Sequence, residues 1–163
     1  RLWNAYGPGQ ALSNPYTGVL AIFASRLHNG QPPMIFEDGR QRRDFVHVED
    51  VAQAFVLALE HERAPGGVFN VGSGVDRTVS EVAELLARAM NRPMAPEIAG
   101  KARIGDIRHC IADISKIRNE LGYRPRKDFS EGLAELAEWV ARQEAKDLVQ
   151  EARKELEARG LVA

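Results

Sequence analysis

Apolar residues along the chain fall into short runs and helically spaced positions, which alternate and together predict an α/β fold. The short runs are bounded by glycine or proline and predict strands at residues 1–6, 32–39, 42–48 and 66–74. Helical spacing predicts helices at residues 18–30, 49–61, 78–90, 114–122 and 128–160, the last being one helix or a pair. Residues 97–113 are predicted to form a loop. Because no repeat or long linker interrupts this order, we expect a single unit over residues 1–163.

Composition limits the partners of the chain. Its 22 basic and 23 acidic residues are mixed along the sequence and give a net charge of −1, so we expect no binding to nucleic acid or to a membrane, and any anion site must be local. No run approaches the ~20 apolar residues of a membrane span, and we find no signal sequence. The single cysteine, Cys110, is expected to be a small buried side chain. It excludes an intramolecular disulfide and favours the cytoplasm.

Five ordered segments carry a resemblance to a known family. They read "RLWNAYGPGQALSNPYTGVLAIF", "FEDGRQRRDFVHVEDVAQAF", "FNVGSG", "RIGDIRHCIADISKIRNELGYRP" and "EGLAELAEW". Their order and spacing resemble the C-terminal half of the NAD-dependent nucleotide-sugar epimerase/dehydratase family, which are extended short-chain dehydrogenases. "GPGQALSNPYTGVL" followed by "IFEDG" most resembles the dTDP-L-rhamnose 4-epimerase-like members. The resemblance implies the last Rossmann strands plus a smaller substrate-binding α/β region, with the N-terminal NAD-binding half absent.

This sequence contains neither the cofactor-binding turn nor the catalytic Tyr-Lys pair of that family. A dinucleotide turn needs closely spaced glycines, and Gly72-Ser73-Gly74 has Arg77 where the third glycine would stand. Tyr123 and Lys127 match the Tyr-x-x-x-Lys spacing by accident, because Pro125 disfavours a helix between them. We therefore expect no catalytic residue in this chain and NAD bound in the intact family but not by this part.

The histidines also offer no metal site by their spacing. His28, His47, His61 and His109 lack a metal-ligand pattern with Cys110. His47 is expected to pack against or cap its helix, the alternative being a general base. No metal ligand is predicted.

The resemblance assigns substrate-binding roles to four main residues. Arg43 and Arg103 would hold the diphosphate, although Lys101 and Arg108 compete with Arg103 for that role. Phe36 would pack on the base, or else be an ordinary core residue. Asn4 would hydrogen-bond the sugar or phosphate, or else serve the turn before Gly7. For Arg43 the alternative is an ion pair with Asp44 or a solvated strand end.

Weaker assignments complete the expected site. Asn14 and Tyr16 would border the sugar, and Asp106 would orient the loop of Arg103. Leu2 and Trp3 would lie near the nicotinamide of an intact enzyme.

These assignments lead to hypotheses of different classes. The first is the binding half of a nucleotide-sugar 4-epimerase acting on a dTDP- or UDP-hexose and inactive alone. The alternatives are the corresponding half of a dehydratase, or a non-catalytic binding or oligomerisation module that associates through its terminal helices. We expect a homo-oligomer or association with the missing half, because a shortened sheet exposes an apolar edge that would leave Trp3, Phe23 and Phe55 partly uncovered.

Overall fold

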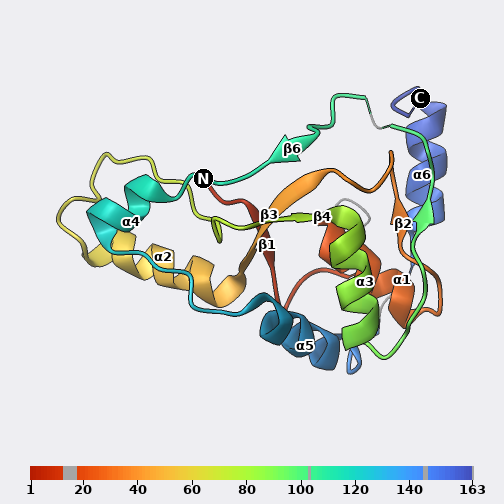
Figure 1. Ribbon diagram of the computed structural model, residues 1–163, viewed down its shortest axis with the longest axis horizontal. Helices are drawn as coiled ribbons and strands as arrows, with labels where there is room; N and C mark the ends of the chain where they lie inside the picture. Colours follow the sequence, from red (N-terminus) through yellow and green to blue (C-terminus); the bar gives the residue numbers. More distant parts are fainter. Residues whose placement is uncertain (13–17, 103, 145–146, 163) are drawn as a thin grey trace.

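Short strands and helices alternate through most of the chain (Figure 1). The computed structural model describes residues 1–12, 18–102, 104–144 and 147–162. Its helices are α1 (Val19–His28), α2 (Val48–Glu60), α3 (Val79–Ala89), α4 (Ser115–Leu121), α5 (Phe129–Val140) and α6 (Val149–Ala158). Its strands are β1 (Asn4–Tyr6), β2 (Met34–Ile35), β3 (Arg42–His47), β4 (Asp76–Thr78), β5 (Glu97–Ile98) and β6 (His109–Cys110).

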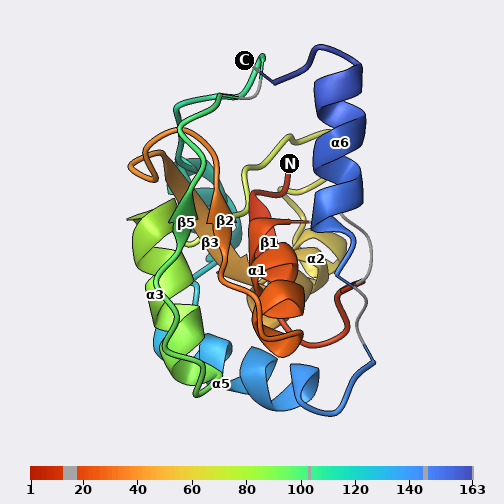
Figure 2. The same ribbon diagram turned by 90° about the vertical axis from the view of Figure 1, so that its right-hand side faces the viewer.

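Strand β3 is the centre of the larger sheet. Antiparallel β4 pairs with its first half along one edge, with Arg43 opposite Arg77. On the other edge, parallel β6 pairs with the first half of β3, and parallel β1 pairs with the second half. The end of β6 therefore meets the start of β1 beside the middle of β3. Strands β2 and β5 form a separate parallel pair, seen side by side in Figure 2.

Helices bury the core in two clusters. The first joins β1 and β3 to α1, α3 and α5 and contains Tyr6, Phe23, Leu86 and Leu133. The second lies around α2, α4 and the segment before Gly72, and contains Phe69, Val71, Ile117, Leu121 and Tyr123. Figure 1 shows α2 and α4 together at one end of the molecule and α1, α3 and α5 toward the other.

Most predicted elements are confirmed, and their ends follow the expected local chemistry. Helix α1 stops before Gly30, whose φ of 71° suits glycine. Asp128 begins α5 by accepting hydrogen bonds from the backbone N–H groups of Ser130 and Glu131. The last predicted helix is a pair, α5 and α6.

Two predictions about regular structure were wrong. Residues 66–74 were predicted to be a strand, but only Val71 forms a β-bridge, with Leu2. Residues 97–113 were predicted to be a loop, but they contain the two-residue strands β5 and β6. Both differences arise because pairing with a distant partner, rather than local spacing, decides such short strands.

The exposure of apolar side chains also differs from expectation. Phe23 is buried in the first core cluster, with 1% of its surface exposed, so the expectation that it is uncovered was wrong. Phe55 on α2 is 57% exposed and Trp3 is half-buried. Among the described residues, no helix has the length and apolar character needed to cross a membrane.

Candidate functional site

The candidate site is a cavity of about 470 Å³ where β6, β3 and the start of β1 meet. The gap arises because β6 ends and β1 begins along one edge of β3. Its lining brings together the predicted residues Leu2, Trp3, Asn4, Arg43 and Asp106 with Arg1, Gly105, Ile107 and Cys110. Residues far apart in the sequence therefore share one cavity.

Arg43 is the fixed cation of this cavity. Its Nη1 donates to the carbonyl oxygens of Arg42 and Arg108, both at 2.9 Å. Its Nη2 donates to Oδ1 of Asp106 at 3.0 Å, and only 14% of its side chain is exposed. The guanidinium group keeps further N–H donors on Nη2 and Nε. A positioned guanidinium of this kind suits a phosphate or a carboxylate.

Asp106 holds Arg43 in place. Its Oδ1 accepts both from Arg43 and from the backbone N–H of Ile107 at 2.9 Å. The alternative prediction, an ion pair between Arg43 and Asp44, was wrong because the Asp44 carboxylate turns to the opposite side. Arg43 therefore faces the cavity with Asp106 as its carboxylate partner.

Asp44 fills the glycine turn that follows Val71. Its side chain is fully buried and accepts from the N–H groups of Ser73 at 2.7 Å and Gly74 at 2.8 Å. A Cβ placed on Gly72 would lie 2.7 Å from Oδ2 of Asp44. Since a carboxylate of the chain itself occupies these amides, the turn does not fit the pyrophosphate of a dinucleotide.

The start of β1 supplies the other wall of the cavity. Asn4 donates from Nδ2 to the carbonyl oxygen of Asp44 at 3.2 Å and lies within the strand, not in a turn. The indole N–H of Trp3 is buried, and it has no hydrogen-bond acceptor within the described part of the chain. A buried donor without a partner is costly, so an acceptor supplied by a ligand would be favourable here.

Other predicted residues lie elsewhere. Phe36, which follows β2, is half-buried and is not among the residues that line this cavity. Arg108 forms ion pairs with Glu37 at 2.6 Å and Asp38 at 2.7 Å, and its guanidinium group lowers the pKa of the Asp38 carboxyl well below its usual range. Lys101 pairs with Glu157 at 3.1 Å. Arg103, Asn14 and Tyr16 lie outside the described residues.

Cys110 is a lining residue that the sequence did not reveal. It is half-buried and free, so the expectation of a buried side chain was wrong. Its place beside Arg43 follows from the pairing of β6 with β3. The spacing of a two-residue strand carries no such signal, which is also why Gly105 and Ile107 were missed.

Tyr123 and Lys127 lie in an irregular segment between α4 and α5. The Tyr123 hydroxyl is buried and donates to the carbonyl oxygen of Gly72 at 3.0 Å, and burial raises the pKa of this phenol well above its usual value. Lys127 Nζ lies between Glu135 at 2.8 Å and Glu49 at 2.9 Å. Tyr123 therefore serves packing and Lys127 serves ion pairing, and the two side chains have different partners.

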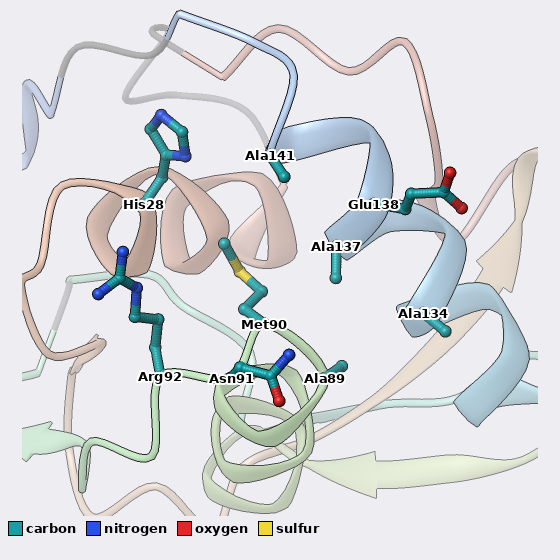
Figure 3. A pocket seen from close by; sticks show the side chains of 9 residues that line it. All are labelled: His28, Ala89, Met90, Asn91, Arg92, Ala134, Ala137, Glu138 and Ala141. Atoms are coloured by element: carbon teal, nitrogen blue, oxygen red, sulfur yellow. The ribbon is translucent and has the colours of Figure 1, made fainter.

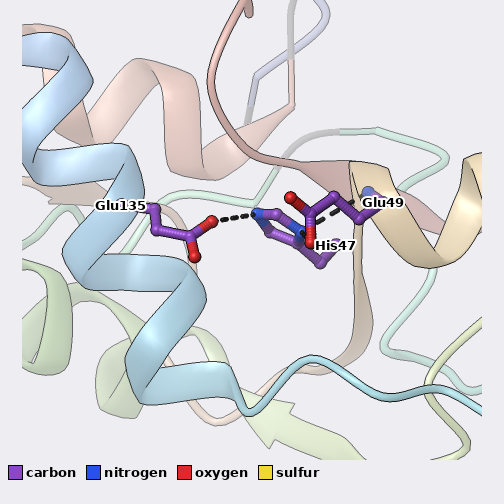
Figure 4. Close-up of side chains that lie close together, drawn as sticks. All are labelled: His47, Glu49 and Glu135. Carbon is purple, nitrogen blue, oxygen red and sulfur yellow. Dashed lines mark hydrogen bonds and ion pairs between the residues drawn. The ribbon is translucent and has the colours of Figure 1, made fainter.

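His47 caps α2, as predicted (Figure 4). Its Nδ1 accepts from the backbone N–H of Glu49 at 3.4 Å, so the neutral ring carries its proton on Nε2, which faces Glu135 at 3.5 Å. Lys127 already bridges the two glutamates. Because Nε2 carries the proton and an ammonium group holds the carboxylates, the cluster of His47, Glu49 and Glu135 does not present a ready set of metal ligands.

Another cavity, of about 440 Å³, lies where the ends of α1 and α3 face α5. Figure 3 shows Met90 pointing into this space between His28 and the alanines of α5. Its charged lining residues include Arg92 and Glu138. The rest of the lining is largely small side chains, and the charged residues have opposite signs, so the cavity has no clear preference for an anion. It is therefore a weaker candidate than the cavity of Arg43.

Comparison with known proteins agrees with the resemblance in the sequence. Residues 1–72 match the sequence profile described as the NAD dependent epimerase/dehydratase family. This part of the chain belongs to the family, and the chain as a whole is similar to its members. It is 37% identical over 143 residues to a dTDP-L-rhamnose 4-epimerase of Burkholderia thailandensis, covering 88% of this chain and 39% of that enzyme. It is 38% identical over 139 residues to a dTDP-glucose 4,6-dehydratase of an Actinoplanes species, covering 85% of this chain and 42% of that enzyme.

Solved structures of family members share the fold. The UDP-glucose 4-epimerase of Thermotoga maritima, solved with UDP-glucose, has a TM-score of 0.77 at 38% identity and covers 85% of this chain. The UDP-N-acetylglucosamine 4-epimerase of Methanobrevibacter ruminantium has a TM-score of 0.78 at 34% identity and also covers 85% of this chain. Each match covers 44% of the solved chain. The protein therefore has part of the extended short-chain dehydrogenase fold and spans less than half the length of these family members.

Proposed function

We propose that this chain is the nucleotide-sugar-binding half of an NAD-dependent nucleotide-sugar 4-epimerase, with a dTDP- or UDP-hexose as substrate. The cavity that gathers Leu2, Trp3, Asn4, Arg43 and Asp106 from separate segments carries the proposal. A nucleotide sugar needs cationic donors for its diphosphate, a flat surface and neutral polar groups, and these residues supply each kind.

In this proposal Arg43 holds the diphosphate. Asp106 and two backbone carbonyls orient its guanidinium group before the ligand arrives, so little side-chain freedom is lost on binding. Asn4 and Trp3 line the same cavity beside it, and the side-chain amide of Asn4 contributes a further hydrogen bond. Such an anchor would keep the nucleotide bound while the sugar changes its orientation.

The cofactor site of the intact enzyme is assigned to the other half. Because the turn at Gly72–Gly74 is filled by Asp44, the described residues offer no dinucleotide cradle, and this chain carries no redox step in the proposal. We expect the chain to be inactive by itself and to bind no NAD. Arg103, Asn14, Tyr16 and Phe36 remain candidate contacts to the substrate.

Calorimetric titration with dTDP, UDP and NAD tests this function. We expect binding of a nucleoside diphosphate but not of NAD, and Arg43→Ala should weaken it by at least roughly tenfold because a charge-assisted hydrogen-bonding group is lost. Arg40→Ala is the matched control, since Arg40 is exposed and lies outside the cavity lining. Absence of binding to every nucleotide, or unchanged affinity in Arg43→Ala, would contradict the proposal.

A dehydratase half is the second candidate. The 38% identity to a dTDP-glucose 4,6-dehydratase is close to the 37% identity to a dTDP-L-rhamnose 4-epimerase. Nucleotide binding alone does not separate the two reactions. Mixing the chain with a separately produced N-terminal half of a family member, then identifying the sugar product, would distinguish epimerisation from loss of water.

A further inference from the structure

A separate cavity of about 330 Å³ lies at the C-terminal ends of β1 and β3. It is bordered by the segment from Ser73 to Arg77 and by the segment from Arg118 to Phe129. None of its lining residues lines the cavity of Arg43. Four basic and two acidic side chains line it, whereas the whole chain has a net charge of −1.

Aromatic side chains form the floor of this cavity. Tyr6, Phe45 and Phe129 are buried, and the Phe129 ring contacts the Tyr6 ring edge-on with centroids 5.4 Å apart. The Arg77 guanidinium lies over the Phe129 ring at 4.4 Å and pairs with Glu81 at 2.9 Å. This stacking fixes one cation beside a flat apolar surface.

Among the residues that the structure describes, two arginines at the rim lack acidic partners. Arg124 donates from Nη1 to the carbonyl oxygens of Tyr123 at 2.9 Å and Arg118 at 3.2 Å. Within the described ranges, neither Arg118 nor Arg124 forms an ion pair, although both line the cavity. Lys127 differs, because Glu49 and Glu135 already hold its ammonium group.

The acidic lining residues are directed to backbone amides. Asp50 is buried and accepts from the N–H groups of Arg126 at 2.8 Å and Lys127 at 3.2 Å. Asp128 accepts from the N–H groups that begin α5. These bonds offset the two negative charges locally, so the charges of Arg118 and Arg124 remain uncompensated by side chains of the described structure.

We propose that this cavity binds a small phosphate-bearing molecule with a flat apolar group. The guanidinium groups of Arg118 and Arg124 both line the cavity and match the oxygens of a phosphate, and a flat group would contact the edges of the aromatic side chains at its inner end. The volume is close to the lower end of ligand cavities in proteins, roughly 300 Å³, which suits a phosphomonoester. The site is independent of the proposed function and adds a second anion site to the chain.

Amide-resolved NMR titration of the isotopically labelled chain with phenyl phosphate, at ionic strength held constant with chloride, tests the proposal. We expect saturable shifts at the amides of Ser73 and of Arg126 to Asp128, with phenyl phosphate binding more tightly than inorganic phosphate or benzoate. Arg118→Ala with Arg124→Ala should weaken binding by at least tenfold. Arg118→Ala alone should also weaken it, and no described hydrogen bond of the fold depends on that side chain.

Control variants separate this site from the cavity of Arg43. Arg43→Ala should leave the shifts at the amides of Ser73 and of Arg126 to Asp128 unchanged, as should Arg142→Ala, which removes an exposed arginine of the same α5 region that pairs with Glu138. Shifts confined to the amides of Asn4 and Asp106 would place the phosphate at the other cavity and overturn the proposal. Equal binding of phenyl phosphate and benzoate would overturn its phosphate specificity, and unchanged affinity in the double variant would overturn the role of the two arginines.

Discussion

Asp44 ties together three segments that meet under the larger sheet. Its buried carboxylate accepts from Ser73 N, Ser73 Oγ and Gly74 N, and at 3.4 Å from Ala112 N. Asp44→Ala would leave the N–H groups of Ser73, Gly74 and Ala112 without this acceptor. We expect it to lower the free energy of unfolding by about 3 kcal/mol, measured by urea denaturation.

An exposed aspartate on the neighbouring strand provides the control for Asp44. Asp76 pairs with Arg42 at the surface, and such pairs contribute little because water screens them. Asp76→Ala should therefore lower the free energy of unfolding far less than Asp44→Ala does. If Asp44→Ala were no more harmful than Asp76→Ala, the carboxylate would not be the acceptor that holds the turn.

His47 makes stability depend on pH. Burial lowers its pKa most strongly, and Lys127 lowers it further, whereas Glu135, Glu49 and Asp50 raise it. Because the folded pKa lies below the unfolded value of about 6.5, the unfolded chain binds the proton more readily, and stability falls as pH drops below that value. His47→Asn keeps a capping side chain without this proton.

Urea denaturation of both proteins between pH 7.5 and pH 5 measures the contribution of His47. The native protein should lose more stability than His47→Asn over this interval, because the other titrating groups are common to both. Parallel loss in the two proteins would show that His47 does not titrate in this range.

The sequence predicted some residues of the candidate site, but it did not predict which side chains they pair with. The motif around "RRDF" indicated Arg43, and the structure gives it Asp106 as a partner. Nothing in the spacing indicated that Arg108 would pair with Glu37 and Asp38, since 70 residues separate Arg108 from Asp38. Which arginine remains available to a ligand is decided by tertiary contacts.

Helix α5 approaches the end of β1 through a glycine. A Cβ placed on Gly132 would lie 2.4 Å from the Tyr6 hydroxyl oxygen and 3.1 Å from His47 Cδ2. Alanine is a better helix former by about 1 kcal/mol, but overpacking a core costs about 1–3 kcal/mol. We expect Gly132→Ala to lower the free energy of unfolding by about 1 kcal/mol overall.

Tyr6→Phe tests the origin of the Gly132 effect because it removes the atom that would be contacted most closely. In that background Gly132→Ala should cost measurably less, as a double-mutant cycle by urea denaturation would show. An identical cost in both backgrounds would place the clash elsewhere.

At the level of elements, local signals predicted helices better than short strands. Val82 and Leu86 recur at helical spacing, and α3 buries both. The glycine-rich segment at Val71 and the polar segment at Cys110 have no period that distinguishes a strand from a loop. In the described part of the chain, Val71 is paired only with Leu2, just before β1, and Cys110 only with β3, so the state of both segments depends on the assembled sheet.

The whole molecule leaves one face of α2 apolar and exposed. Leu59 is 85% exposed, Phe55 57% and Val56 50%. Leu2 and Val68 are exposed to about the same extent as Val56. Phe55, Leu2 and Val68 also line one shallow cavity, so they form a continuous surface. Such a surface is typical of a protein interface.

We expect the isolated chain to associate through this face of α2. Size-exclusion chromatography with light scattering should give a mass above that of the monomer, and Phe55→Glu with Leu59→Glu should restore the monomer because charges oppose burial of the face. Ile104→Glu is the matched control, since Ile104 is 63% exposed but lies outside α2. A monomer at every concentration, or association that survives the double substitution, would rule out this face. Loss of association together with unchanged nucleotide binding would show that the interface and the cavity of Arg43 are separate properties of one chain.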